Sequence, residues 1–286
     1  MENKVLLYAD SSIDLSPELR ERYHINTLPI HVILNDQTYE DGVDITSQEI
    51  FDNYYKTKKL PKTAAINFDD IYRALEPKVK EGYEIVYISL GSALSSSFRN
   101  STLAAEELSG KVYPIDSCSL SSGAGLLAIE AAERIEKGMS AKQVAEEVQA
   151  LNQKNHASFV LDTLEFMKAG GRCSAVTAFG ANLLGIKPCI KVYNEQNGAM
   201  AVHKKYRGKF EKVIFDYVDE TLQSYDNIRT DRIFVTYSTT ENNLHERVRD
   251  YIKEKGIFKE IFITTASGTI SSHCGPGCLG ILFMTE

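Results

Sequence analysis

Short apolar runs separated by amphipathic stretches fill the first half of the chain. The runs predict strands at Val5 to Ala9, Asn26 to Ile33, Glu84 to Leu90 and Val112 to Ile115. The run from Glu84 to Leu90 is apolar almost throughout, which is typical of a central strand buried on both faces of a parallel sheet. Helical stretches follow these strands, so we expect a doubly wound, mostly parallel sheet through about residue 155.

Local signals predict where the helices of this half begin. Ser16-Pro17 is typical of a helix start, because serine caps a free amide and proline suits the first helical position. Thr46 and Glu49 have capping-box spacing and open a helix to about Lys58. The remaining expected elements are a connection at Pro61-Lys62-Thr63, a helix near Asp69, a loop at Gly91 to Ser97, a helix from Phe98, a loop at Asp116 to Ser122 and a helix at Gly123 to Glu136.

The pattern changes after His156. A strand at Phe159 to Leu161 and a short helix at Thr163 to Ala169 precede a break at Gly170-Gly171-Arg172, after which more helix is expected. Lys187 to Tyr193 and Ala199 to Lys205, joined by a turn, predict a hairpin. Strand and helix alternate from there to Met284. We therefore predict two domains, an N-terminal α/β domain over residues 1–155 and a C-terminal α/β domain with a mixed sheet over residues 156–286.

Size and charge narrow the function. At 286 residues with 43% hydrophobic content, the chain can bury one large core or two ordinary ones. Its net charge is -7, and its basic residues are scattered, which argues against a nucleic acid partner. The N-terminus lacks the apolar run of a signal peptide, no segment reaches the length of a membrane span, and the five cysteines show no CxxC spacing. We expect a cytoplasmic protein with reduced cysteines and no bound metal.

The run His273-Cys274-Gly275-Pro276-Gly277 is the strongest candidate for a site. It lies between the apolar runs Ile261 to Thr265 and Cys278 to Met284, so the sequence predicts a turn between two buried strands. Glycine and proline remove side-chain bulk beside a titratable imidazole and let a ligand approach. A hydrogen-bonded structural histidine is the alternative.

Hydroxyl groups provide a second candidate. Ser92, Ser95, Ser96 and Ser97 lie at the expected start of a helix, where free amides and the helix dipole favour an anion such as a carboxylate or phosphate. Serines that only cap the helix are the alternative. Thr63 should emerge at the same edge of the sheet and could donate to the same anion. A turn or capping threonine is the alternative, which the residue by itself favours.

Several classes of enzyme lack support. The run from Asp10 to Leu15 carries two carboxylates, which we interpret as turn and cap residues rather than metal ligands. Serine, histidine and aspartate are present, but the chain has no G-x-S-x-G elbow. It also has no Walker A pattern and no G-x-G-x-x-G after the first strand. We therefore expect neither nucleotide hydrolysis nor dinucleotide redox chemistry.

Taken together, these motifs resemble the DegV family across nearly the whole chain. The resemblance rests on their order and spacing: Asp10-Ser11-Ser12-Ile13-Asp14-Leu15, Pro61-Lys62-Thr63, the serine loop, Asp116-Ser117, the stretch from Leu164 to Arg172, Lys187-Pro188, and His273-Cys274-Gly275-Pro276-Gly277.

The resemblance implies a function. It implies a two-domain α/β protein that binds one long-chain fatty acid, such as palmitate or oleate, in a buried tunnel between its domains. By the family pattern Thr63, Ser95 and His273 hold the carboxylate. Residues assigned to the surrounding head-group network are Arg172, Ser96 and Gly275, and Arg207 is assigned to a surface that faces a partner. No residue is assigned a catalytic role and no cofactor is implied.

Family members of this kind act as the lipid-carrying subunit of a bacterial fatty acid kinase. The resemblance thus implies a separate ATP-binding kinase that makes an acyl-phosphate, which agrees with the lack of a nucleotide motif here. It implies no membrane-spanning segment, and leaves transient contact with a membrane surface open.

Two departures from the family pattern lie at the head group. This chain has Leu94-Ser95-Ser96-Ser97-Phe98 where the family usually has L-S-G-T-Y, and Thr63-Ala64 where it has T-S.

Two other functions stay open from the residues alone. One is an acyl-ester hydrolase that uses Ser95 and His273, and the other is a regulatory protein whose affinity for a partner depends on lipid.

Overall fold

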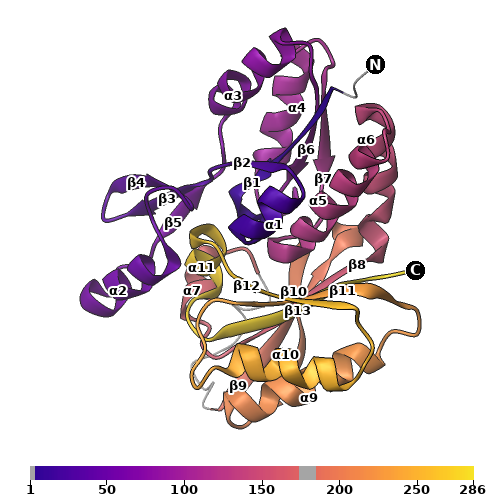
Figure 1. The fold of residues 1–286 in the computed structure, drawn as a ribbon. Coiled ribbons are helices and arrows are strands. Elements are labelled where there is room, and N and C mark those ends of the chain that lie inside the picture. The colour runs from indigo at the N-terminus through magenta and orange to yellow at the C-terminus, as the bar shows by residue number, and fades with distance from the viewer. Residues whose placement is uncertain (1–3, 174–184) are drawn as a thin grey trace.

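The computed structural model describes residues 4–173 and 185–286, which form a mixed α/β fold (Figure 1). Its described strands make a parallel sheet in the order β2-β1-β6-β7, a mixed sheet in the order β10-β9-β8-β13-β11-β12, and a small antiparallel sheet in the order β4-β3-β5. The predicted fold class is therefore confirmed. None of the helices in this described part has the length and apolarity that a membrane crossing requires.

The parallel sheet follows the predicted pattern of strand and helix. Its strands are β1 (Val5–Asp10), β2 (Ile25–Leu28), β6 (Glu84–Ser89) and β7 (Val112–Asp116), and all neighbours run parallel. The helices of this half are α1 (Pro17–Arg22), α3 (Phe68–Lys80), α4 (Ser97–Glu107), α5 (Ser121–Glu136) and α6 (Ala141–Ala150), with the 3-10 turns η1 (Ser11–Ile13) and η2 (Leu151–Lys154). Strand β6 is central and almost entirely buried, as its apolar run predicted.

The predicted helix starts are confirmed at two positions. The Ser16 hydroxyl accepts a hydrogen bond from the amide of Leu19 at 3.3 Å, with proline at the first helical position. Helix α2 (Ser47–Thr57) begins with a complete capping box between Thr46 and Glu49. These contacts depend on residues three positions apart, which is why the sequence alone reveals them.

The predicted strand from Asn26 to Ile33 is wrong. The chain makes two strands there, β2 in the parallel sheet and β3 (His31–Leu34) in the small sheet. Pro29 lies between them, and because proline has no amide to donate, it ends the pairing of β2. The connection predicted at Pro61-Lys62-Thr63 is also wrong in part, since Lys62–Ala64 form β5, which pairs with β3 and places Thr63 opposite Val32.

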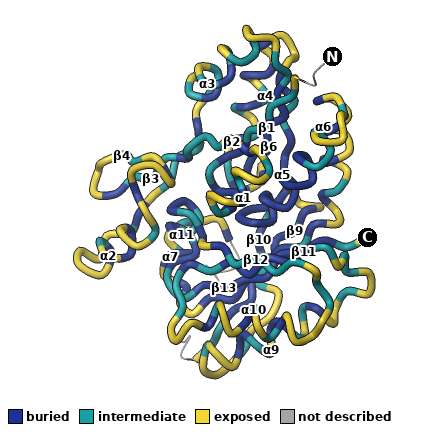
Figure 2. The backbone as a smooth tube through the Cα atoms, viewed as in Figure 1, coloured by how far each residue is buried: buried dark blue, intermediate teal, exposed yellow. Residues whose placement is uncertain are grey.

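The small sheet and helix α2 form a lobe that projects from the rest of the molecule (Figure 1). It consists of β3, β4 (Gln37–Glu40), β5 and α2, and we call it the side lobe. Its own apolar cluster includes Val32, Ile50 and Phe51, and also takes in Phe166 from the second half of the chain. The outer side of α2 is exposed in Figure 2.

The mixed sheet belongs to the second half of the chain. Its strands are β8 (Asn155–Leu161), β9 (Ile186–Tyr193), β10 (Ala199–Arg207), β11 (Ile228–Tyr237), β12 (Glu260–Thr265) and β13 (Cys278–Thr285). The other elements are α7 (Glu165–Gly170), α9 (Phe210–Gln223), α10 (Leu244–Glu254), α11 (Gly268–Cys274) and the 3-10 turn η3 (Asn194–Gln196). The predicted hairpin is confirmed, because β9 and β10 pair antiparallel. The helix expected beyond Arg172 falls mainly outside the described residues.

Helix α5 connects the two large sheets. Its first twelve residues are all buried, and it contacts β1 and β6 of the parallel sheet as well as β8 and β13 of the mixed sheet. Figure 2 shows it as a continuous buried segment. One apolar cluster accordingly extends through both halves, while a second lies between the mixed sheet and helices α9 and α10. The division into domains at residue 155 stays a prediction, although β8 begins there.

The prediction for the His273 run needs correction. His273 is helical and lies near the C-terminal end of α11, whereas the sequence predicts a turn between strands. The glycines follow the helix. Ser267 caps the helix and Gly275 ends it with a φ of 74°. Small residues between those caps gave no helical periodicity, so the sequence signal was weak. The strand before α11, β12, is an edge strand and only half-buried, whereas β13 is buried as expected.

Candidate functional site

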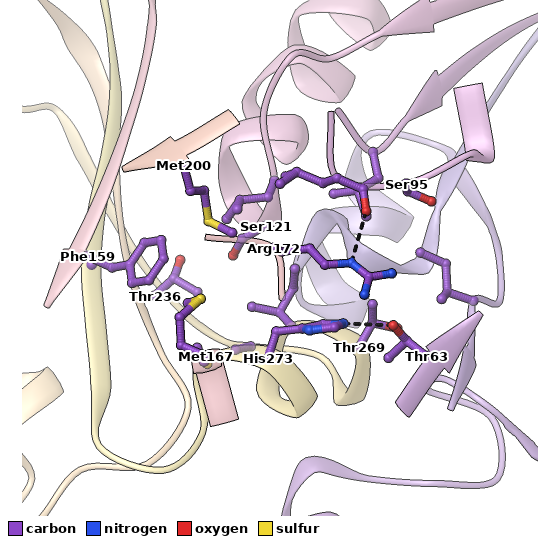
Figure 3. Close-up of a pocket in the computed structure, with 18 of the residues that line it drawn as sticks. Thr63, Ser95, Ser121, Phe159, Met167, Arg172, Met200, Thr236, Thr269 and His273 are labelled. Carbon is purple, nitrogen blue, oxygen red and sulfur yellow. Dashed lines mark hydrogen bonds between the residues drawn. The ribbon is translucent and has the colours of Figure 1, made fainter. Parts of the chain in front are cut away.

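A cavity of about 290 Å³ lies where the carboxyl ends of the parallel strands meet the mixed sheet (Figure 3). Ile30, Leu90 and Leu120 line it from segments that follow β2, β6 and β7. This is the edge at which ligands of doubly wound sheets bind. The other apolar lining residues are Ala64, Ala65, Leu94, Phe159, Met167, Met200, Ala266, Ile270, Cys274, Gly280 and Leu282.

A pair of polar side chains lies at one end of the cavity, where the side lobe meets α11. Thr63 on β5 and His273 on α11 form a hydrogen bond of 2.7 Å between Oγ1 and Nε2. In Figure 3 these two side chains lie opposite the end of the cavity that carries Phe159 and Met200. Hydroxyl groups of Ser121, Ser158 and Thr236 line the rest of the cavity, and each is bonded to another side chain: to Asp14, Tyr217 and Ser122. The cavity therefore has a mainly apolar body and a polar pair at this end.

His273 is uncharged at neutral pH. Burial, together with the nearby Arg172 cation, lowers the pKa of its imidazole from 6.5 to about 4. Nδ1 is buried and has no hydrogen-bond partner among the described residues. A neutral imidazole carries one N–H and a hydroxyl one O–H, and the bond between His273 and Thr63 uses one of them, so the pair can offer its other donor without adding charge.

The serine loop divides into two parts. Ser95 and Ser96 line the cavity, and Ser95 Oγ accepts a hydrogen bond of 3.2 Å from the amide of Ser97. Ser97 is instead buried and donates to Asp10 at 2.8 Å, while the amide of Ser92 donates to Asp116 at 3.1 Å. Two of the four serines thus face the candidate site, and the other two positions fix the loop. Ser96 is the N-cap position of α4 but makes no side-chain cap.

Arg172 lies at the mouth of the cavity. Its side chain donates to the carbonyl of Gly170 at 2.8 Å and to that of Leu94 at 3.4 Å. Figure 3 shows the guanidinium between Ser95 and the pair of Thr63 and His273. A cation in this position can attract an anion to the polar end without being buried.

Two other predicted site residues lie outside the cavity. The carbonyl of Gly275 accepts a hydrogen bond of 2.6 Å from Ser238, and a Cβ at Gly275 would lie 2.8 Å from the ring of Phe166. Gly275 therefore fixes the C-terminal end of α11 through its contacts with Ser238 and Phe166. Arg207 is exposed at the end of β10, away from the cavity lining.

The geometry does not resemble a hydrolase site. His273 Nε2 is bonded to Thr63 and not to Ser95, and no described carboxylate is bonded to Nδ1. A nucleophilic serine needs a base within hydrogen-bond reach and a group that orients the base. Within the described residues there is also no group of three or more histidines, cysteines or acids placed to hold a metal.

Most of the apolar lining was not identified from the sequence. Phe159, Met167 and Met200 come from three separate elements, and each belongs to an apolar stretch typical of an ordinary core. The alternation along β8 and β10 could have indicated which residues share a face. It could not have indicated that these faces enclose a space.

Replacing Gly170 by alanine tests how tightly the imidazole is held. A Cβ at Gly170 would lie 2.3 Å from His273 Nδ1, so we expect Gly170→Ala to displace the ring and to cost about 1–3 kcal/mol of unfolding free energy. Denaturant unfolding and the NMR signals of the imidazole measure both effects. Gly171→Ala is the control, because Gly171 has a φ of +65° and no atom within 4 Å of its Cβ position. It should cost about 1–2 kcal/mol and leave those signals unchanged; equal shifts in both variants would contradict the account.

The low pKa of His273 predicts a pH dependence. The unfolded imidazole binds its proton more tightly than the folded one, so the stability that the neutral ring contributes above pH 6.5 is lost as the pH falls towards 4. Lipid-free protein should therefore lose on the order of 3 kcal/mol relative to His273→Gln over this range. Burial raises the pKa of Asp14 to about 7, so the contribution of Asp14 to stability increases as the pH falls. The wild type and His273→Gln share that contribution, and it cancels in their difference. Parallel stability curves for the two proteins would contradict the prediction.

Comparisons with known proteins identify the family and the fold. The family model described as "Uncharacterised protein, DegV family COG1307" matches residues 4–286. A DegV domain-containing protein of Clostridium acetobutylicum is 29% identical, with 99% of each chain covered. A Thermus thermophilus structure described as fatty acid binding of a DegV family protein is 27% identical, with a TM-score of 0.90 and coverage of 99% of this chain and 100% of that one.

A third comparison concerns the fold alone. The fatty acid kinase B3 protein of Streptococcus pneumoniae, solved loaded with linoleic acid, is 22% identical with a TM-score of 0.83 over 99% of this chain and 100% of that one. The family model matches residues 4–286 and the fold is the same, so this chain belongs to the DegV family.

Proposed function

We propose that this protein binds one long-chain fatty acid in the cavity between residues 1–155 and residues 156–286. The observation that carries the proposal is a mainly apolar cavity that has a neutral, hydrogen-bonded pair, Thr63 and His273, at one end. An elongated apolar molecule with a single polar head matches that lining. Fatty acid binding by the Thermus thermophilus relative supports the same ligand class.

The apolar lining supplies most of the binding energy. Burial of a methylene group contributes about 0.8 kcal/mol, so a chain of sixteen carbons gains on the order of 11 kcal/mol before the costs of ordering. Met167 and Met200 line the cavity, and their flexible side chains can adapt to the shape of an acyl chain. Fatty acids such as palmitate or oleate are the expected ligands.

The polar end orients the ligand. A carboxylate removed from water needs hydrogen-bond donors, and the hydroxyls of Thr63 and Ser95 with the imidazole of His273 can provide them. Ser96 lines the cavity beside Ser95, and Arg172 adds a positive charge at the mouth. Gly275 contributes by holding the end of α11.

We propose further that the protein is a carrier that presents the carboxylate to a separate ATP-binding kinase. In that reaction a carboxylate oxygen attacks the γ-phosphorus of ATP, ADP leaves, and an acyl-phosphate forms. The Streptococcus pneumoniae fatty acid kinase B3 protein, which shares this fold, supports this role. Arg207, exposed on β10, is the proposed contact for the partner. The five cysteines are all buried, and we propose that the protein acts in a reducing cytoplasm.

Mass spectrometry of the purified protein tests the ligand. Under native conditions we expect one additional mass of a few hundred daltons that is lost on denaturation and that matches a fatty acid, or uptake of one added oleate per chain. Protein that is empty and takes up neither palmitate nor oleate would contradict the proposal.

Replacement of Thr63 by valine tests the head group. Loss of a charge-assisted hydrogen bond costs about 1.5–3 kcal/mol, so the affinity for oleate should fall by roughly tenfold or more. Thr102→Val is the matched control, because the Thr102 hydroxyl donates to the carbonyl of Phe98 outside the cavity. Titration calorimetry should show unchanged affinity for that control. Equal affinities for Thr63→Val and the wild type would place the carboxylate elsewhere.

Charge reversal at Arg207 tests the partner surface. Arg207→Glu should leave oleate affinity unchanged, because Arg207 lies outside the cavity, and should lower the rate of acyl-phosphate formation with a fatty acid kinase. Lys212→Glu on the neighbouring helix α9 is the control for net charge. Unchanged phosphorylation by the Arg207 variant would remove this residue from the interface.

A further inference from the structure

Helix α11 is held at its N-terminus by two carboxylates from the first half of the chain. Asp14 accepts a hydrogen bond from the amide of Ser267 at 2.9 Å, and Asp41 accepts from the amides of Gly268 at 2.8 Å and Thr269 at 3.0 Å. The fourth free amide, that of Ile270, donates to the Ser267 hydroxyl at 3.4 Å. All the amides that a helix start leaves without intrahelical partners are therefore satisfied.

Asp41 belongs to the side lobe. It follows β4, and its own amide donates to the carbonyl of Ile30 at 2.9 Å. The residue is 2% exposed, and a third donor, the Ser11 hydroxyl, lies 3.3 Å from Oδ2. A buried carboxylate that accepts from backbone amides at a helix start is favoured by the helix dipole and by charge-assisted bonds.

The sequence of α11 accommodates this carboxylate. A Cβ at Gly268 would lie 2.8 Å from Asp41 Oδ1 and 3.2 Å from Ile50 of α2. Glycine at this position therefore allows the side lobe to approach the helix. The contact between Asp41 and α11 depends on both residues.

The side lobe also contacts the opposite end of the same helix. Thr63 on β5 bonds His273 in the last turn of α11, and β3 pairs with β5 as well as with β4, the strand before Asp41. Seven helical residues span only about 10 Å, so a displacement at one end moves the other end as part of a rigid unit. The position of His273 relative to Thr63 thus depends on the Asp41 contact.

We infer that Asp41 is a positioning residue for the fatty acid site: by bonding the first amides of α11, it sets the register in which His273 meets Thr63. The inference rests on the proposed function for its effect on lipid, but its effect on His273 is independent of any ligand. Asp41 lies beside the N-terminus of α11 and does not line the cavity.

Two variants remove the contact from opposite sides. In Asp41→Asn, a carboxamide keeps one acceptor oxygen and turns an NH₂ group towards a helix amide. Gly268→Ala pushes the carboxylate away and serves if the first variant does not fold. Val218→Ala is the control for a purely structural loss, because Val218 is buried in the second apolar cluster, between α9 and the mixed sheet.

The measurements are oleate affinity, by calorimetry on folded protein, and the NMR titration of the His273 imidazole without lipid. We expect the Asp41 and Gly268 variants to bind oleate at least tenfold more weakly and to titrate His273 at higher pH, while Val218→Ala changes neither. In a Thr63→Val background, Asp41→Asn should weaken binding less than threefold, because the two changes act on one pair of groups.

The outcomes separate this inference from the proposed function. Wild-type protein that fails to bind oleate overturns the proposed function alone, and the titration of His273 then still decides the role of Asp41. If His273 titrates identically in the wild type and in both variants, Asp41 does not position it. Fully additive losses of affinity in the double variant would also overturn the inference.

Discussion

The candidate site depends on how helix α11 is held between the two halves of the molecule. The helix has only seven residues, too few to be stable alone, and its surroundings therefore determine its position. Its start is bonded to Asp14 and Asp41, its end carries His273 against Thr63, and Gly275 ends it beside Phe166. These contacts join the side lobe, the parallel sheet and the mixed sheet at one element. The cavity lies where those three parts meet.

The polar end of the cavity offers hydrogen-bond donors without a buried cation. An imidazole kept neutral by burial avoids the large cost of placing a cation in an apolar space, and hydroxyl groups provide further donors. Arg172 remains exposed, where its charge stays hydrated and still attracts an anion to the mouth. This division suits a ligand that must bind firmly through its chain and yet leave its carboxylate accessible to a partner.

The sequence predicted those features that depend on neighbouring residues, and it failed where distant contacts decide. Strands β1, β6 and β7 of the parallel sheet and the capping box at Thr46 follow from local patterns, and the structure confirms them. Pro29 divides a run that looked like one strand. The small residues of α11 gave no helical pattern, and carboxyl groups distant in the sequence help to stabilise that helix. Thr63 and His273 are each candidates from the local sequence, but only the family resemblance assigns them to one carboxylate, because 210 residues separate them and no local pattern shows that they meet. The apolar lining looked like ordinary core for the same reason.

The position of the ligand's carboxylate tests the account most directly, and a crystal structure of the protein with bound oleate would show it. We expect electron density for one chain that runs past Met167 towards Phe159 and Met200, with a carboxylate oxygen within hydrogen-bond distance of the Thr63 hydroxyl. A carboxylate found at the Phe159 end, or lipid bound only on the outer surface while the cavity stays closed to it, would contradict the account.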